Sequence, residues 1–176
     1  TQKDLEEQLR HDATHDALTG MLNRKAFGHM CELACHRGAR TNATIGMLYV
    51  DLDGFKQIND SFGHEAGDRV LVEAGRRLVG CVMGDDTVAR LGGDEFAVLL
   101  ESVHDDRAIA VAEKILFALG QPITGIPDDV RIGASIGIAL RSSEGIEIST
   151  LMRDADAAMY HAKRNGRARW ELVGDR

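Results

Sequence analysis

The sequence predicts an α+β or mixed α/β fold in which helices pack on a central sheet. Helical and strand-like patterns alternate along the chain, and one pair of strand-like runs is joined by a short turn that contains glycine. Of the 176 residues, 44% are hydrophobic, which is enough for one sizeable core, whereas the chain is short for two domains. Interleaved strands and helices with at least one hairpin are typical of a sheet covered by helices.

The first half of the chain predicts four helices and one strand. Residues 1–13 form a polar helical pattern with a thin apolar stripe, and Asn23 is a good N-cap for a second helix that ends near Gly38. Residues 44–50 are almost entirely apolar, as expected of a buried central strand. A short helical pattern at residues 56–60 precedes a longer one with a clear apolar face. That apolar face consists of Val70, Leu71, Ala74 and Leu78.

The second half predicts a hairpin followed by two helices and two strands. Residues 87–91 and 96–100 are strand-like, and Gly92 and Gly93 between them supply the positive backbone angles of a tight turn. The tip of this hairpin is acidic. The remaining elements are a helix at residues 105–119, a strand at 130–140, a helix that starts at Ser149 or Thr150, and a strand at 169–173 that closes the sheet.

Two segments are expected in the domain organisation. Residues 1–14 form a connector helix, and residues 15–176 form the single domain that carries the chemistry. The apolar stripe of the connector consists of Leu5 and Leu9, and a helix this short is not stable alone. It fits a link from an upstream sensor domain, the end of a two-stranded coiled coil, or a frayed terminal helix.

Charge and composition exclude several classes of protein. The net charge is −7 and 28% of the residues are charged, so neither charge-driven disorder nor a nucleic-acid-binding surface is expected. No apolar run approaches the roughly 20 residues of a membrane-spanning helix, so no membrane contact is expected within this segment. The odd number of cysteines favours a reducing, cytoplasmic location, with any membrane tether outside the segment. Cys31 and Cys35 share a helix face beside His36, a pattern that fits core thiols better than a metal site.

Two acidic clusters stand at the ends of predicted strands. Asp51 and Asp53 follow the buried strand, and Asp94 and Glu95 form the tip of the hairpin. If the hairpin pairs beside the buried strand, these carboxylates meet at one end of the sheet, where their repulsion is costly unless a cation is bound. Hard oxygen ligands of this kind suit Mg²⁺, which completes its shell with substrate phosphates. The alternative is a solvated acidic rim.

Backbone and basic groups near these clusters predict a phosphate site. Gly54 and Phe55 can present backbone N–H groups where the chain turns into a helix, and Lys56 adds a positive charge. Lys163 and Arg167 are expected to stand one helical turn apart and to reach the same phosphates. Arg167 follows a glycine, which leaves an ordinary surface position as the alternative.

Asn59 and Asp68 offer the groups that a guanine base requires. Guanine presents N1–H and an amino group to a carboxylate, and its O6 or N3 to an amide donor, whereas adenine lacks that donor pair. Each residue also has an ordinary interpretation, Asn59 as a helix-end residue and Asp68 as a surface charge.

The combination of these motifs resembles the GGDEF family of diguanylate cyclases. The family signature is Gly92-Gly93-Asp94-Glu95-Phe96, and five specified residues rarely match by chance in a chain of this length. The resemblance covers residues 16–173. The other matching segments, in the order of the family, are Asp16-Ala-Leu-Thr-Gly20 with Asn23-Arg24, Asp51-Leu-Asp-Gly-Phe-Lys56, Asn59-Asp60, Gly63-His64, Gly67-Asp68, Ser135-Ile-Gly137, residues 155–160, Ala162-Lys163 and Gly166-Arg167.

This resemblance implies a fold, a reaction and a set of site residues. The fold is a central, mainly antiparallel sheet flanked by helices, like the palm of class III nucleotide cyclases. The reaction joins two GTP molecules into cyclic di-GMP and releases two pyrophosphates, with Mg²⁺ or Mn²⁺, across a symmetric homodimer in which each domain holds one GTP. The implied roles are metal binding by Asp51, the Leu52 carbonyl, Asp94 and Glu95; guanine recognition by Asn59 and Asp68; phosphate binding by Gly54, Phe55, Lys56, Lys163 and Arg167; and proton transfer by Asp94 or Glu95.

The sequence departs from the family at the product-inhibition site. Many members carry an Arg-x-x-Asp motif that ends five residues before the signature, whereas here that segment runs from Met83 to Asp86. Methionine cannot make the bidentate contacts of arginine, so the resemblance implies weak or absent product inhibition through this site. The alternative function is a catalytically silent, GTP-binding regulatory module, which would keep the same binding residues. A product-sensing module is disfavoured by Met83, and a cyclase that acts on one nucleotide is disfavoured by the signature.

Overall fold

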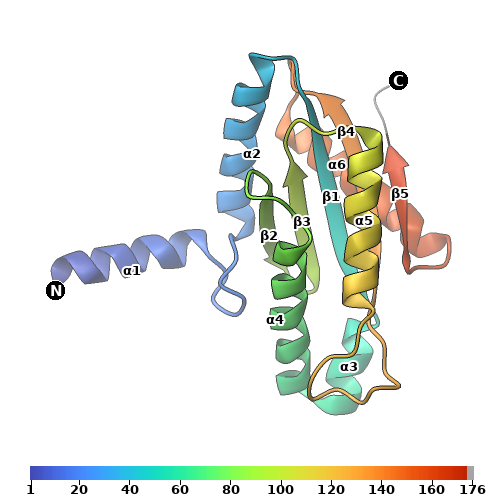
Figure 1. Cartoon of the computed structure of the whole chain (residues 1–176). Coiled ribbons are helices and arrows are strands. Elements are labelled where there is room, and N and C mark those ends of the chain that lie inside the picture. The colour runs from blue at the N-terminus through green and yellow to red at the C-terminus, as the bar shows by residue number, and fades with distance from the viewer. Residues whose placement is uncertain (174–176) are drawn as a thin grey trace.

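A five-stranded sheet organises the part of the chain that the computed structural model describes, residues 1–173 (Figure 1). The strands are β1 (Thr44–Asp53), β2 (Thr87–Gly92), β3 (Glu95–Leu100), β4 (Gly133–Ser142) and β5 (Arg169–Val173). Their order is β2-β3-β1-β4-β5, and every neighbouring pair is antiparallel except β4 and β5, which are parallel. The predicted fold, a mainly antiparallel sheet flanked by helices, is confirmed. The last three residues of the expected domain, 174–176, lie outside the described residues.

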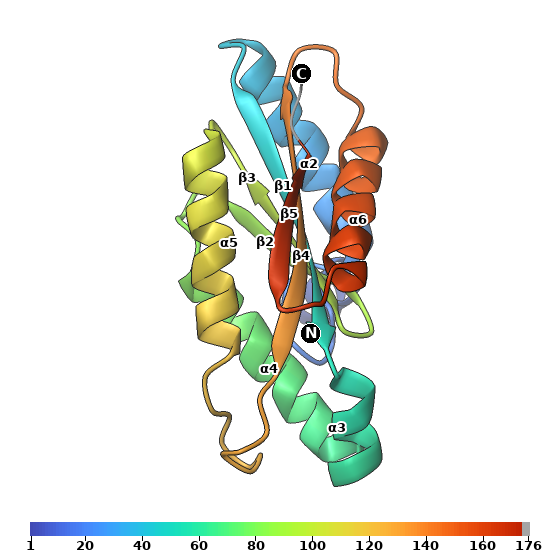
Figure 2. The same cartoon turned by 90° about the vertical axis from the view of Figure 1, so that its right-hand side faces the viewer.

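Helices cover both faces of this sheet (Figure 1, Figure 2). The helices of the described part of the chain are α1 (Gln2–Thr14), α2 (Arg24–Ala39), α3 (Phe55–Phe62), α4 (His64–Gly80), α5 (Asp105–Leu119) and α6 (Ile148–Arg164). Figure 2 shows α4 and α5 on one face and α2 and α6 on the other. α1 projects away from the sheet, and its Leu5 and Leu9 are each 60% exposed. None of the helices within residues 1–173 combines the length and apolar character needed to span a bilayer.

β1 is buried on both faces, which explains its nearly continuous apolar sequence. Leu48 and Val50 belong to the core cluster that includes α4 and α5, whereas Met47 belongs to the cluster that includes α2 and α6. Cys31 and Cys35 are free thiols within this second cluster, as expected of core residues.

Gly137 allows α6 to pack directly against the backbone of β4. A Cβ atom placed at Gly137 would lie well inside 3.0 Å of the Ala155 carbonyl oxygen and of the Met159 amide nitrogen. No side chain larger than hydrogen fits between these two elements without displacing the helix. This close approach brings the C-terminal end of α6, with Lys163, to the end of β1.

The segment after α1 is fastened to the outer strand of the sheet. The Arg90 backbone N–H donates to the Leu22 carbonyl at 3.0 Å, which extends the sheet beyond β2. The Arg90 guanidinium donates to both carboxylate oxygens of Asp16 at 3.0 Å and also to the Gly93 carbonyl at 2.8 and 3.0 Å. One half-buried arginine therefore joins the N-terminal segment to the turn between β2 and β3.

The starts of α6 and β4 differ from the expected ones, and β1 and α3 are longer than expected, at Thr44–Asp53 and Phe55–Phe62. α6 starts at Ile148, before Ser149 or Thr150, because the preceding carbonyl already accepts the first helical N–H bonds. β4 starts at Gly133 and not at Val130, because Val130 closes a turn by donating its N–H to the carbonyl three residues earlier. The apolar pattern predicted these elements, but local hydrogen bonds determine where they begin.

Candidate active site

The pairing of β1 with β3 brings the two predicted acidic clusters together. Asp51 lies directly opposite Glu95 in the antiparallel register. The Leu52 N–H donates to the backbone carbonyl of Asp94 at 3.2 Å, which holds the turn against the end of β1. Asp51, Asp94 and Glu95 therefore meet at one end of the sheet.

Asp51 is a buried carboxylate with one oxygen unused. Asp51 is 4% exposed. Its Oδ2 contacts the Lys163 ammonium, and its Oδ1 is buried without a hydrogen-bond partner. Burial raises the pKa of Asp51 to about 6; nearby Asp94 acts in the same direction and Lys163 opposes it. Burial and the charge of Asp51 also raise the pKa of Glu95, which Arg24 partly offsets from 3.8 Å.

The chemistry of these residues fits a divalent cation that takes only part of its ligands from the protein. The unused oxygen of Asp51 and the neighbouring carboxylates of Asp94 and Glu95 favour a positive charge, and the Leu52 carbonyl lies on the same segment. Within residues 1–173, no group of three or more His, Cys, Asp and Glu side chains forms a ready cage for a metal. This arrangement suits Mg²⁺ or Mn²⁺, because Mg²⁺ typically takes one or two protein carboxylates and obtains its other ligands from phosphates and water.

Replacing Asp51 by asparagine is expected to stabilise the metal-free chain by roughly 1–3 kcal/mol at neutral pH, because the buried charge is removed. In the wild type the folded state keeps a proton on Asp51 that the unfolded chain has already released, since its pKa of about 6 lies above the ordinary value of 3.8. The free energy of unfolding therefore falls as the pH rises through that window. Urea titrations at pH 4 and pH 7.5 measure the effect. A variant that gains no more stability at pH 7.5 than at pH 4 would contradict this account.

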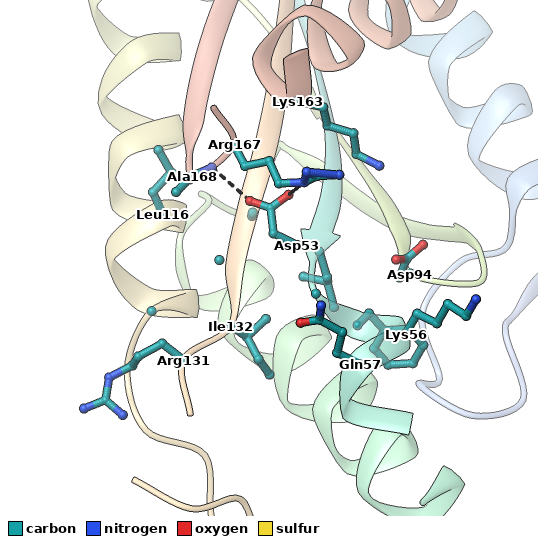
Figure 3. Close-up of a pocket in the computed structure, with 16 residues that line it drawn as sticks. Asp53, Lys56, Gln57, Asp94, Leu116, Arg131, Ile132, Lys163, Arg167 and Ala168 are labelled. Carbon is teal, nitrogen blue, oxygen red and sulfur yellow. Dashed lines mark hydrogen bonds and ion pairs between the residues drawn. The ribbon is translucent and has the colours of Figure 1, made fainter. Parts of the chain in front are cut away.

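A cavity of about 1000 Å³ adjoins the acidic cluster and is lined by all five predicted phosphate-binding residues (Figure 3). Gly54 adopts a left-handed conformation, with a φ of 76°, and caps α3, so the first N–H groups of this helix are free of helical partners. Lys56 is exposed on the first turn of the helix. The predicted site residues that line the cavity are Leu52, Gly54, Phe55, Lys56, Asp94, Lys163 and Arg167.

Arg167 reaches this cavity by a route that differs from the expected one. α6 ends at Arg164, so the prediction that Lys163 and Arg167 stand one helical turn apart is wrong. Arg167 follows Gly166 in a loop and has a φ of 63°, in the left-handed region. Lys163 and Arg167 nevertheless line the same cavity, one from the helix and the other from the loop (Figure 3).

The predicted guanine-binding pair lies at the junction of α3 and α4, outside this cavity. The Asn59 side chain packs against Gly67, where a Cβ atom would overlap its amide oxygen. Asp68 is exposed and lines a separate hollow of about 520 Å³ with Arg69 and Pro122. The structure thus places Asn59 beside the helix turn that carries Asp68, without joining the pair to the phosphate-binding residues in one pocket.

Sequence reasoning assigned no role to Arg24 or Arg90 and placed Asp53 only in the acidic cluster for a cation. Arg24, the first residue of α2, donates to the Tyr49 hydroxyl at 3.1 Å and lies near Glu95. Asp53 accepts two hydrogen bonds at the wall of the cavity, and Arg90 holds the acidic turn. Arg24 and Asp53 stand in the family motifs and Arg90 stands just before the signature, but their partners lie far away in the sequence and could not be identified from spacing.

The Asp86 carboxylate at the degenerate product-inhibition motif already has partners. It accepts from the Met83 backbone N–H at 3.0 Å and forms an ion pair with Arg107 from α5. The Asp86 side chain is only 2% exposed, whereas Met83 is 69% exposed. The motif therefore presents a methionine to solvent and keeps its carboxylate inside.

A mainly antiparallel sheet with an acidic turn beside a large cavity that carries basic side chains places the chain in the class of nucleotide-cyclase palm folds. The family model described as "Diguanylate cyclase, GGDEF domain" matches residues 13–169, so the chain belongs to the GGDEF domain family.

Known relatives share much of this domain. The bifunctional diguanylate cyclase/cyclic di-GMP phosphodiesterase MucR of Pseudomonas aeruginosa is 44% identical over 155 residues, which cover 88% of this chain and 23% of MucR. Diguanylate cyclase DgcM of Escherichia coli is 42% identical over 170 residues, 96% of this chain and 40% of DgcM. The chain thus spans well under half the length of either relative. The solved coiled coil and GGDEF domain of DgcB from Caulobacter crescentus, in complex with c-di-GMP, superposes with a TM-score of 0.88 at 31% identity and covers 97% of this chain and 91% of that one.

Proposed function

We propose that this chain is a diguanylate cyclase that condenses two GTP molecules into cyclic di-GMP and two pyrophosphates, with Mg²⁺ or Mn²⁺, across a symmetric homodimer. The observation that supports it most is the acidic cluster of Asp51, Asp94 and Glu95 at the edge of a cavity lined by basic side chains. Opposite charges placed side by side suit a metal-bound triphosphate, because the carboxylates bind the cation and the basic groups bind the phosphates.

Each group of residues has a separate task in this proposal. Asp51, the Leu52 carbonyl, Asp94 and Glu95 hold the cation, which when bound neutralises phosphate charge and lowers the pKa of the attacking hydroxyl. The phosphates are bound by the N–H groups at Gly54 and Phe55 and by the side chains of Lys56, Lys163 and Arg167. Asn59 and Asp68 recognise guanine at the junction of α3 and α4.

The reaction needs two domains because each binds one GTP. The 3′-hydroxyl of one nucleotide attacks the α-phosphorus of the other, a new O–P bond forms, and the bond to the β-phosphate breaks to release pyrophosphate. Asp94 or Glu95 accepts the proton of the hydroxyl. A second, identical transfer closes the ring, so a twofold-symmetric pair of domains matches the symmetry of the product.

Product formation from GTP and Mg²⁺, followed by chromatography over a wide range of protein concentrations, tests the proposal. We expect cyclic di-GMP to form at a rate that rises faster than linearly with protein concentration, because pairing of two acidic domains limits the reaction. GTP binding without product at any concentration, even after forced dimerisation, would instead support a silent regulatory module. One observation supports that second candidate function: a relative that is 36% identical over 165 residues, PdeR of Escherichia coli, is named only as a cyclic di-GMP phosphodiesterase.

The domain organisation follows the same proposal. Residues 1–14 act as a connector from an upstream sensor domain, and residues 15–176 form the cyclase domain. The exposed Leu5 and Leu9 on α1 and the greater length of the relatives support a connector at this end of the domain.

Product binding through the degenerate motif is expected to be weak, because Met83 supplies no bidentate contact and the Asp86 carboxylate is already paired with Arg107. Replacing Met83 by arginine should strengthen cyclic di-GMP binding by about tenfold or more, since hydrogen bonds to charged groups contribute roughly 1.5–3 kcal/mol. Isothermal titration calorimetry of both proteins checks this. Sub-micromolar binding by the wild type that is lost in Asp86→Ala would show that the motif still functions.

A further inference from the structure

Asp53 lies on the wall of the cavity with both carboxylate oxygens engaged by protein donors (Figure 3). Its Oδ1 accepts from the Ser135 hydroxyl at 2.7 Å, and its Oδ2 accepts from the Ala168 backbone N–H at 2.9 Å. Ser135 is fully buried on β4, and the Asp53 side chain is 11% exposed. In contrast to Asp51, whose Oδ1 is unpartnered, Asp53 is arranged to hold protein groups and not a cation.

The loop that Asp53 contacts has an unusual backbone. Arg167 and Ala168 are consecutive non-glycine residues with φ values of 63° and 48°, which L-residues adopt rarely. Such a conformation persists only where surrounding contacts hold it. Two contacts do so here: the Arg167 N–H donates to the Ala162 carbonyl at 3.0 Å, and the Ala168 N–H donates to Asp53. The loop is thus held to α6 on one side and to β1 on the other.

The hydrogen bond from the Ala168 N–H to Asp53 contributes more than the ion pair between Asp53 and Arg167. The Arg167 Nε lies 4.0 Å from Asp53 Oδ1, and the arginine side chain is 59% exposed, so this ion pair contributes little. The hydrogen bond from the Ala168 N–H to Asp53 has an ordinary length of 2.9 Å and lies at the residue that follows Arg167. The main effect of Asp53 is therefore on the direction in which the loop carries the arginine.

We propose that Asp53 is a positioning residue, which, fixed by Ser135, clamps the loop at Ala168 and so aims Arg167 into the cavity toward the triphosphate. The assignment rests on the proposed function, because Arg167 is a phosphate-binding residue only in that context. It also gives a task to Ser135, a residue of the Ser135-Ile-Gly137 motif that the reaction itself does not use.

Equilibrium binding of GTP in the presence of Mg²⁺ tests the clamp with four variants: Asp53→Ala, Asp53→Asn, Arg167→Ala and the double variant Asp53→Ala/Arg167→Ala. Asp53→Ala should weaken binding by about tenfold, a loss similar to that in Arg167→Ala. Asparagine can accept from Ala168 and donate to Ser135, so Asp53→Asn should bind within about threefold of wild type. The double variant should bind no more weakly than Arg167→Ala, because Asp53 acts through the arginine. In product assays, KM for GTP should rise more than kcat falls.

The outcomes separate this assignment from the proposed function. If the unmodified chain bound no GTP, both would fail. Normal GTP binding by Asp53→Ala would overturn only the positioning role of Asp53. Losses of GTP affinity that add fully in the double variant would do the same. If Asp53→Ala does not fold, Ser135→Ala and the double variant Ser135→Ala/Arg167→Ala provide the same test. Ser135→Ala alone should weaken GTP binding by about twofold to threefold, and the double variant should bind GTP no more weakly than Arg167→Ala. Asp129→Ala, at an exposed carboxylate in the loop before β4, is the matched control and should bind GTP as the wild type does.

Discussion

Replacing Asp94 by alanine is expected to abolish cyclic di-GMP formation, with turnover reduced by roughly 10³-fold or more. Asp94 lines the cavity, stands beside Asp51 and Glu95, and is proposed both to hold the cation and to accept a proton. The backbone contact that places the turn, from the Leu52 N–H to the Asp94 carbonyl, does not involve the side chain and survives the substitution. The loss should therefore appear in chemistry and not in folding. Chromatography of product formed from GTP and Mg²⁺ measures it.

The control for this prediction is the same substitution at an unrelated carboxylate. Asp129 is exposed in the loop before β4 and is not among the cavity residues, so Asp129→Ala should keep full activity. Thermal unfolding of both variants checks that the fold is intact. Full activity in Asp94→Ala would show that the site has been assigned to the wrong residues.

Gly137→Ala is expected to be the most destabilising small substitution in the sheet. The added methyl group would overlap backbone atoms of Ala155 and Met159, which cannot move aside as a flexible side chain would. α6 would have to shift away from β4, at a cost of about 3 kcal/mol or more, since overpacking against backbone leaves no easy relaxation. For a domain of this size the melting temperature should fall by roughly 6–12 °C. The shift would also displace Lys163 and weaken GTP binding.

Gly28→Ala is the matched control for Gly137→Ala. Gly28 lies inside α2, and a Cβ atom there meets no atom within 4 Å. The substitution should raise stability by about 0.5–1 kcal/mol, because alanine favours the helix over glycine. Differential scanning calorimetry of the two variants compares them directly. A Gly137→Ala protein as stable as wild type would show that α6 does not pack against β4 as described.

Patterns within a few residues could be predicted from the sequence, but contacts between distant segments could not. The apolar periodicity of α5 predicted its bounds, and the glycines between β2 and β3 predicted the turn that carries Asp94 and Glu95. The four-residue spacing of Lys163 and Arg167 predicted that they stand one helical turn apart, which is wrong because α6 ends at Arg164.

The sequence grouped Asp53 with Asp51 as a carboxylate for a cation, and its protein partners could not be predicted because they depend on the sheet register and the closing loop. The side chain contacts Ser135, 82 residues away, and Ala168, 115 residues away. The same limit applies to Arg90 and Asp16, which are 74 residues apart. Asp16, Asp53 and Ser135 stand in recognisable motifs, yet only the folded chain shows which segments they contact.

The contacts of Arg90 join the N-terminal segment directly to the acidic turn. Its guanidinium holds Asp16 with one nitrogen and the Gly93 carbonyl with two others, so the exit of α1 and the turn that precedes Asp94 share one rigid, planar group. A displacement of α1 would reach that turn through these hydrogen bonds, in addition to the contacts that Leu18, Met21 and Leu22 make with the two hydrophobic clusters. The connection from the projecting helix to the acidic turn thus ends at Gly93, one residue before Asp94.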